Sequence, residues 1–128
     1  AGRCNGMFFA PDGKLIGCAD ENNEMWEIDS AGNHRVLFGK FNDRKLNGPN
    51  DVWVHPVLPI MYFTDPYYQR PWWEHKQPPQ EVQAIYRVGR DGDRIERLPF
   101  NFVQPNGIVG DAKRGVVYVA DIGEGNIY

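Results

Sequence analysis

The sequence predicts an all-β fold, because short apolar runs alternate with turns and no helical period is present. None of the 128 residues lies in a stretch with a convincing 3.6-residue repeat. Apolar runs instead meet turns such as Pro11-Asp12-Gly13, and a second apolar run follows each turn. This alternation is typical of antiparallel strands joined by tight connections.

Three segments of the chain repeat one pattern, and they begin at Asn5, Asn50 and Asn106. Each opens with Asn followed by Gly or Asp, and each closes with Asp after the same 15-residue step. The first two units continue through an aromatic run and a turn into a fourth run, whereas the third unit ends after its third run. Tandem four-stranded units of this length predict the blades of a β-propeller.

We expect residues 1–128 to form one partial propeller domain of roughly two and a half blades. A four-stranded blade buries its faces against neighbouring blades. Two and a half blades cannot close a ring, so the remainder of the propeller is expected to come from a longer protein. The blade units start near residues 5, 50 and 106.

The repeated Asn and Asp residues are expected at one mouth of the central channel. The first strand of each blade lines the channel, and the second strand returns to the same face. Side-chain oxygens gathered there form a ligand set that hard cations such as calcium prefer. The alternative is that these residues only stabilise turns through their own backbone. Asn50 and Asn106 each follow a Pro, which fixes the approach of the chain and favours a binding role.

An insertion at residues 66–83 lengthens the loop between the second and third strands of the second unit. It is rich in Pro, Tyr and Trp and is expected to form a semi-rigid flap on the same face as the asparagines. Its aromatic side chains would line a pocket and stack on a sugar ring or an apolar substrate. The alternative is that Trp72 and Trp73 pack on the neighbouring blade.

The composition disfavours several functional classes. A net charge of −3 with scattered basic residues gives no reason to expect a nucleic-acid partner. No apolar stretch approaches the roughly 18 residues of a membrane span. Ser30, the one serine, lies in a turn predicted on the opposite face, so no serine nucleophile is expected. Cys4 and Cys18 fit no zinc motif and are expected to be buried thiols or one incidental bridge, and His55 is expected to be structural.

Several stretches of the chain resemble one known family. They are NGMFFAPDGKL, KLNGPNDVWVHP with MYFTDP, QAIYRVGRDGDRIERL, and QPNGIVGD with VVYVADIG. Together they resemble, over nearly the whole chain, the gluconolactonase branch of the family of senescence marker protein (regucalcin), gluconolactonase and luciferin-regenerating enzyme. The resemblance implies a six-bladed propeller that holds a divalent cation in its channel mouth and hydrolyses lactones.

The resemblance also implies particular site residues. Asn50 and Asn106 match two of the four metal ligands of the family. The other two, a Glu before residue 1 and an Asp after residue 128, would lie outside this chain, as would the general base. Asp51 and Asp65 are expected to orient Asn50 without touching the cation. The implied cation is Ca²⁺, with Zn²⁺, Mg²⁺ or Mn²⁺ as alternatives.

The function expected on these grounds is metal-dependent opening of a sugar lactone, in which the cation polarises the lactone carbonyl. Tyr67, Trp72 and Trp73 of the flap are expected to line the substrate. Two alternatives stay open at this point. One is a propeller that binds a sugar or a protein without catalysis, and the other is a phosphotriesterase-like hydrolase on the same scaffold.

Overall fold

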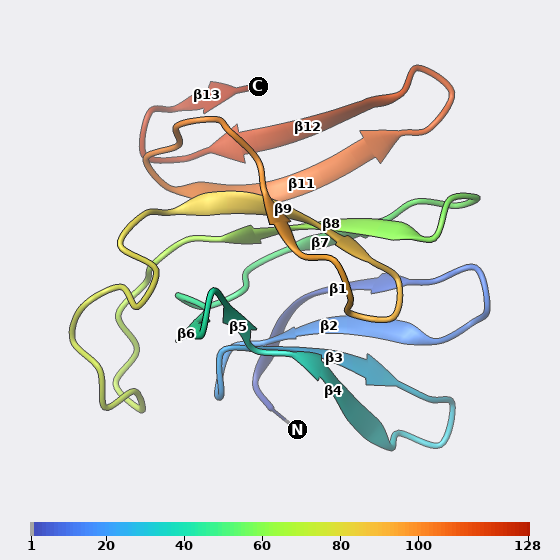
Figure 1. Cartoon of the computed structure of the whole chain (residues 1–128), viewed down its shortest axis with the longest axis horizontal. Coiled ribbons are helices and arrows are strands. Elements are labelled where there is room, and N and C mark those ends of the chain that lie inside the picture. Colours follow the sequence, from blue (N-terminus) through green and yellow to red (C-terminus); the bar gives the residue numbers. More distant parts are fainter. Residues whose placement is uncertain (1) are drawn as a thin grey trace.

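The computed structural model describes residues 2–128, which form three antiparallel sheets packed side by side (Figure 1). None of these residues is helical, so the prediction of an all-β fold is confirmed. The described residues accordingly contain no helix that is long and apolar enough to cross a membrane.

The first predicted unit forms a four-stranded sheet in which each strand pairs with the next along the chain. Its strands are β1 (Cys4–Phe9), β2 (Leu15–Ala19), β3 (Glu24–Ile28) and β4 (His34–Phe38). Successive side chains of a strand point to opposite faces, and the face toward the second sheet carries the buried Ile16, Cys18 and Met25. The opposite face leaves Met7 and Phe9 exposed.

The second and third units form a four-stranded and a three-stranded sheet. The second consists of β7 (Val52–Val54), β8 (Ile60–Asp65), β9 (Ala84–Gly89) and β10 (Glu96–Arg97). The third consists of β11 (Pro105–Asp111), β12 (Val116–Asp121) and β13 (Asn126–Ile127). Because β7 contacts both β1 and β11, the first strands of the three sheets lie next to one another.

Two clusters of buried apolar side chains join the sheets. The cluster between the first and second sheets includes Phe63 and Tyr86, whose rings stack with centroids 5.1 Å apart. The cluster between the second and third sheets is built around Trp53. Each large side chain buried in this way contributes about 1.5–3 kcal/mol. Cys18 lies in the first cluster, Cys4 is half-buried, and both are free thiols.

A two-stranded hairpin, β5 (Lys40–Phe41) and β6 (Arg44–Lys45), follows the first sheet and was not predicted from the sequence. Its turn residues Asn42 and Asp43 have φ values of 49° and 63°. Asn and Asp adopt this left-handed conformation more readily than most residues. The ring of Phe41 lies 5.1 Å from that of Tyr86, so the hairpin covers the outer end of the core.

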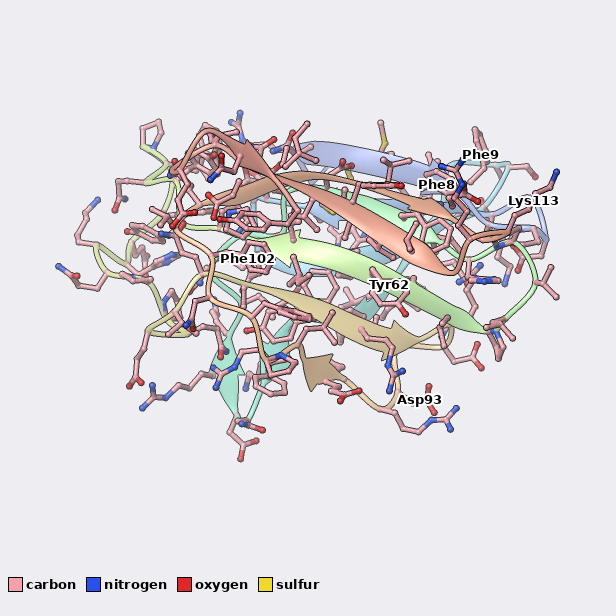
Figure 2. The ribbon with its side chains drawn as sticks, turned by 90° about the horizontal axis from the view of Figure 1, so that it is seen from above. Phe8, Phe9, Tyr62, Asp93, Phe102 and Lys113 are labelled. Carbon is pink, nitrogen blue, oxygen red and sulfur yellow. The ribbon has the colours of Figure 1, made fainter. Side chains whose placement is uncertain are left out.

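The turns between the first and second strands of the sheets gather at the end of the molecule opposite the flap. Figure 2 shows Phe9 and Lys113 at this end and Phe102 toward the other. His55 lies in the corresponding turn of the second sheet, where its Nδ1 accepts the N–H groups of Val57 at 3.1 Å and Leu58 at 2.9 Å. These contacts agree with the structural role expected for His55.

The third sheet packs closely on the second at Gly110. A Cβ atom on Gly110 would lie 2.4 Å from the buried ring of Trp53. Gly110→Ala is therefore expected to lower the free energy of unfolding by about 1–3 kcal/mol, because the buried ring or the backbone beside it must shift to admit the methyl group. Urea unfolding measures the change, with Val57→Ala, at an 83% exposed position in a turn, as control. An equal loss in the two variants would contradict the close packing.

Candidate functional site

The first strands of the sheets contain an irregularity at their Asn step. In β11 the pairing with β12 shifts by one residue between Pro105 and Ile108, so Asn106 and Gly107 together oppose one residue. The pairing of β1 with β2 shifts in the same way at its own Asn-Gly step. Such β-bulges turn side chains out of the regular alternation and are common beside active sites. The repeated Asn thus occupies a position where the strand redirects its side chain.

In the second sheet, Thr64 lies opposite the corresponding Asn step, which precedes β7. Asn50 donates its backbone N–H to the carbonyl of Thr64 at 2.9 Å, and Thr64 donates its own to the carbonyl of Asp51 at 3.0 Å. The Thr64 hydroxyl accepts the Asp51 N–H at 3.1 Å and donates to the carbonyl of Asn106 at 2.6 Å. One fully buried residue therefore bonds to both Asn50 and Asn106. The sequence analysis did not single it out, although a hydroxyl directly before the repeated Asp was an available signal.

Asn50 is also bonded to the first sheet. Gly6 donates its N–H to the carbonyl of Asn50 at 2.7 Å. A Cβ atom on Gly6 would lie 2.3 Å from Oδ1 of Asp51, so this position has room only for glycine. Asn5 itself is exposed. The Asn steps of the three first strands consequently lie side by side, at the end of the sheets where the flap begins.

Asp51 joins the second sheet to the third. Its Oδ1 accepts the N–H of Val52 at 2.9 Å, and its Oδ2 accepts the N–H of Ile108 at 3.0 Å. Within residues 2–128 no hydrogen bond links this carboxylate to the amide of Asn50. Asp51 therefore acts on the site through the backbone, by fixing β7 against β11.

Asp65, the last residue of β8, holds the segment that leads to Asn50. It is fully buried, and its two oxygens accept the N–H groups of Asn47 at 2.9 Å and Gly48 at 2.8 Å. These donors stand just before Pro49, which fixes the backbone ahead of Asn50. Asp65 thus positions Asn50 by way of the preceding loop and forms no hydrogen bond with its side chain in the part of the chain described.

Asp121 repeats this arrangement in the third sheet, whereas Asp20 does not. Asp121 accepts the N–H groups of Val103 at 2.7 Å and Gln104 at 2.8 Å.

In the first sheet the pairing of the first two strands is one residue shorter, so Asp20 lies just beyond β2. Its Oδ2 accepts a hydrogen bond from Nε of Arg70 in the flap at 2.8 Å. Its Oδ1 is buried and has no partner among residues 2–128.

Burial raises the pKa of Asp65 to about 7, although the two backbone donors oppose the shift. The folded pKa therefore lies above the value of about 3.9 for an unfolded Asp. The uncharged Asp65 carboxyl therefore stabilises the folded state fully below about pH 4, and this stabilisation is lost as the pH rises to about 7 and the carboxyl ionises. We expect the free energy of unfolding to fall across this window, and to fall less in Asp65→Asn. Urea unfolding at several pH values tests this, and equal slopes in the two proteins would contradict it.

Asn50 and Asn106 supply the amide oxygens at this end of the sheets. Asn50 is 7% exposed, and its side chain forms no hydrogen bond within residues 2–128. Asn106 is half-buried and donates from Nδ2 to the hydroxyl of Tyr68 at 3.0 Å. Its Oδ1 accepts no hydrogen bond from the described chain. Neutral amide oxygens left without a protein donor fit a hard cation such as Ca²⁺.

By their chemistry, the described residues would form only part of a cation site. The carboxylates of Asp51, Asp65 and Asp121 are all engaged by backbone N–H groups. Residues 2–128 contain no group of three or more His, Cys, Asp or Glu side chains that could hold a metal ion. Two amide oxygens are fewer than the roughly 6–8 oxygen ligands of Ca²⁺, so a cation held there would need further oxygen ligands.

The flap (residues 66–83) contains no strand and extends from β8 at the left of Figure 1. Trp73 is 5% exposed and donates from Nε1 to the carbonyl of Asp20 at 2.8 Å. Its ring also lies over Gly48, where a Cβ atom would approach it to 2.5 Å. Trp73 therefore packs on the first sheet and on the segment that leads to Asn50.

The other aromatic residues of the flap lie in different surroundings. Trp72 is 39% exposed, and the guanidinium of Arg3 lies 4.3 Å from its ring. With Trp73 it lines a cavity of about 600 Å³ between the flap and the first sheet. Neither Asn50 nor Asn106 lines this cavity. Tyr67 is half-buried, and its N–H donates to Oε1 of Gln83 at 2.7 Å. Tyr68, which was not selected from the sequence, is the flap residue that bonds the side chain of Asn106.

Comparisons with known proteins were made for the sequence and for the fold. The family model described as SMP-30/Gluconolactonase/LRE-like region matches residues 1–128. No curated protein sequence matches the chain. The gluconolactonase of Xanthomonas campestris, described as important in glucose secondary metabolic pathways, is 25% identical with a TM-score of 0.87, over 97% of this chain and 42% of its own. A second structure, of a protein provisionally named a gluconolactonase, is 25% identical with a TM-score of 0.85. The match covers 97% of this chain and 43% of that protein.

The chain therefore spans less than half the length of these two structures. The family model nevertheless matches it from end to end, and the resemblance inferred from the sequence motifs is confirmed. The structural matches extend over all three sheets and the flap. We conclude that this chain belongs to the SMP-30/gluconolactonase/LRE-like family.

Proposed function

We propose that this chain is one side of a six-bladed propeller in a longer protein, which binds a divalent cation at its channel mouth and opens a sugar lactone. The solved structures it resembles are a gluconolactonase and a protein provisionally named as one, and each is more than twice the length of this chain. The function is therefore proposed for the full-length protein that contains these residues, with a small lactone as its substrate.

The outer faces of the first and third sheets support the presence of further blades. Met7 and Phe9 are 51% and 68% exposed on one outer face, and Val109 and Tyr118 are 56% and 41% exposed on the other. Apolar sheet faces at both ends of a stack are typical of blades that have lost their neighbours. We propose that the remaining blades of the propeller cover these two faces.

The observation that carries the proposed cation site is the bonding of Asn50 and Asn106 to one residue, Thr64. Thr64 bonds the backbone N–H of Asn50 and the backbone carbonyl of Asn106, which supports a common site for the two side-chain amides, while the nearby carboxylates accept backbone N–H groups. We propose Asn50 and Asn106 as two ligands. Ca²⁺ suits them better than Zn²⁺, which prefers nitrogen and sulfur ligands, and Mg²⁺ or Mn²⁺ would also accept oxygens.

A bound divalent cation would act as a Lewis acid on the lactone carbonyl. The neutral oxygens of Asn50 and Asn106 leave most of its charge available for the oxygen of the substrate. Thr64 and Asp51 hold the two strands so that these oxygens stay in place. The general base would come from another part of the protein, since the nearby carboxylates of this chain are engaged.

We propose that the flap walls the substrate pocket and limits the entry of water. Tyr67 would contact the substrate, and Trp72 would do so where the substrate extends toward the cavity between the flap and the first sheet. Trp73 would support them from beneath, where it is buried against the first sheet. Aromatic faces of this kind stack on the apolar faces of sugar rings. The same surface also suits a protein that binds a sugar without hydrolysing it.

The proposed function is tested by following the hydrolysis of glucono-δ-lactone with a pH indicator in the full-length protein. Hydrolysis above the spontaneous rate is expected with Ca²⁺, with loss on chelation and recovery when Ca²⁺ is returned. A rate equal to the spontaneous rate with Ca²⁺, Zn²⁺, Mg²⁺ and Mn²⁺ would reject a lactonase and favour a binding protein. Hydrolysis of a phosphotriester in place of the lactone would favour the other alternative.

A further inference from the structure

We propose that the hydroxyl of Tyr68, held in place by Arg70 and Asp20, fixes the amide of Asn106 so that its carbonyl oxygen faces the cation. This inference rests on the proposed function. It makes Tyr68 a positioning residue for a ligand, because its hydroxyl acts on the cation only through Asn106.

The contact between Tyr68 and Asn106 selects one end of the amide. Nδ2 of Asn106 donates to the hydroxyl of Tyr68 at 3.0 Å, so the NH₂ end faces the flap and the carbonyl end is turned away from it. The two ends of a side-chain amide have nearly the same shape but opposite hydrogen-bonding character. Without an acceptor at the NH₂ end, the amide could rotate and present its donors to the cation. While the hydroxyl accepts from Nδ2, the NH₂ end is satisfied and the carbonyl oxygen is left for the cation.

The flap keeps Tyr68 in place through a largely buried ion pair. Nε of Arg70 donates to Oδ2 of Asp20 at 2.8 Å, and the two side chains are 29% and 7% exposed. The guanidinium of Arg70 also lies 5.7 Å from the centre of the Tyr68 ring. Little screening reaches a pair this buried, and loss of either partner leaves a charge uncompensated. Arg70 thus links the ring of Tyr68 to the first sheet.

Asp20 anchors the flap at a second point. Its carbonyl accepts the Nε1 hydrogen bond of Trp73 at 2.8 Å. In the third sheet the pairing of the first two strands includes Asp121, whereas in the first sheet it stops at Ala19. Asp20 therefore lies outside the paired strand and is free to bind the flap. The carboxylates of Asp65 and Asp121 bind the backbone of their own sheets, whereas Asp20 binds the flap. The flap therefore starts in the second sheet, is fastened to the first and touches the third at Asn106.

The test replaces Tyr68 with Phe in the full-length protein, which removes the hydroxyl and keeps the ring. Ca²⁺ affinity, measured by calorimetry, is expected to fall about 10-fold, the size of effect seen when the partner of a metal ligand is lost. In the cation-free protein, the side-chain NH₂ signals of Asn106 are expected to shift in ¹H–¹⁵N spectra. Tyr62→Phe is the matched control, because Tyr62 lies in β8 outside the flap and its hydroxyl forms no hydrogen bond among the described residues. It should change neither the affinity nor the Asn106 signals.

A double-variant cycle separates positioning from general support of the flap. In Asn106→Ala no side-chain amide remains for the hydroxyl of Tyr68 to hold. Adding Tyr68→Phe to this variant should therefore change Ca²⁺ affinity less than about 2-fold. An equal loss in both backgrounds would overturn the positioning role, since it would show that the hydroxyl acts through packing alone.

The cycle also separates this inference from the proposed function. If Asn106→Ala binds Ca²⁺ as tightly as the wild-type protein, the proposed cation site is wrong and this inference falls with it. If Asn106→Ala loses affinity while Tyr68→Phe keeps both the wild-type affinity and the wild-type Asn106 signals, only the role of Tyr68 is overturned.

Discussion

Asn106→Ala is expected to lower kcat/KM for lactone hydrolysis by the full-length protein by at least about 100-fold, because it removes a proposed ligand of the cation. The fold should be retained. The contacts that hold this segment use the carbonyl of Asn106 and the N–H of Ile108, and the substitution keeps both. Steady-state kinetics with a pH indicator measures the loss, and urea unfolding checks that stability is unchanged.

The matched control for this prediction is Asn101→Ala. Asn101 is an exposed Asn in the loop before β11, and no hydrogen bond of its side chain is present among the described residues. Its replacement should leave both turnover and stability at the wild-type level. Wild-type turnover in a well-folded Asn106→Ala protein would remove Asn106 from the site.

Asp65→Ala is expected to lower the free energy of unfolding by about 3–5 kcal/mol, the largest effect on stability among these predictions. The substitution leaves the N–H groups of Asn47 and Gly48 without their acceptor in the interior. It also removes the contact that fixes the segment before Asn50, so Ca²⁺ affinity should fall together with stability. Urea unfolding at pH 7 measures the first effect and calorimetry the second.

Two further variants calibrate this result. Asp65→Asn keeps the shape of the side chain and one acceptor oxygen. Its free energy of unfolding should therefore lie between those of the wild type and Asp65→Ala. Asp111→Ala removes a partly exposed carboxylate that accepts two N–H groups in a surface turn, and it should cost less than about 1 kcal/mol. If Asp65→Ala costs no more than Asp111→Ala, Asp65 does not hold the loop.

The sequence was sufficient to predict the all-β class, because both the pairing of neighbouring strands and their turn chemistry are local. Sequence-adjacent strands joined by short turns pair with each other, as β1 with β2 and β11 with β12. The Asn step marks where each first strand opens, and the family motifs supplied the expected ligands. Whether Asn50 and Asn106 bind a cation remains a prediction.

The residues that the sequence did not reveal act across sheets or through the flap. Thr64 bonds a carbonyl in another sheet, and Tyr68 reaches Asn106 from a loop without regular structure. Neither contact follows from strand period or turn propensity, because both depend on tertiary packing. The different role of Asp20 arises from a one-residue difference in strand pairing between the first and third sheets. The sequence does not show this difference, because the step from Asn to Asp is 15 residues in every repeat.

The central claim is that Asn50 and Asn106 together hold a divalent cation. Calorimetric titration of Ca²⁺ into the full-length protein and into its Asn50→Ala/Asn106→Ala double variant tests it most directly. The wild-type protein is expected to bind one Ca²⁺ per propeller, and the folded double variant is expected to bind it at least about 100-fold more weakly. Equal affinity and stoichiometry in the two proteins would contradict the claim.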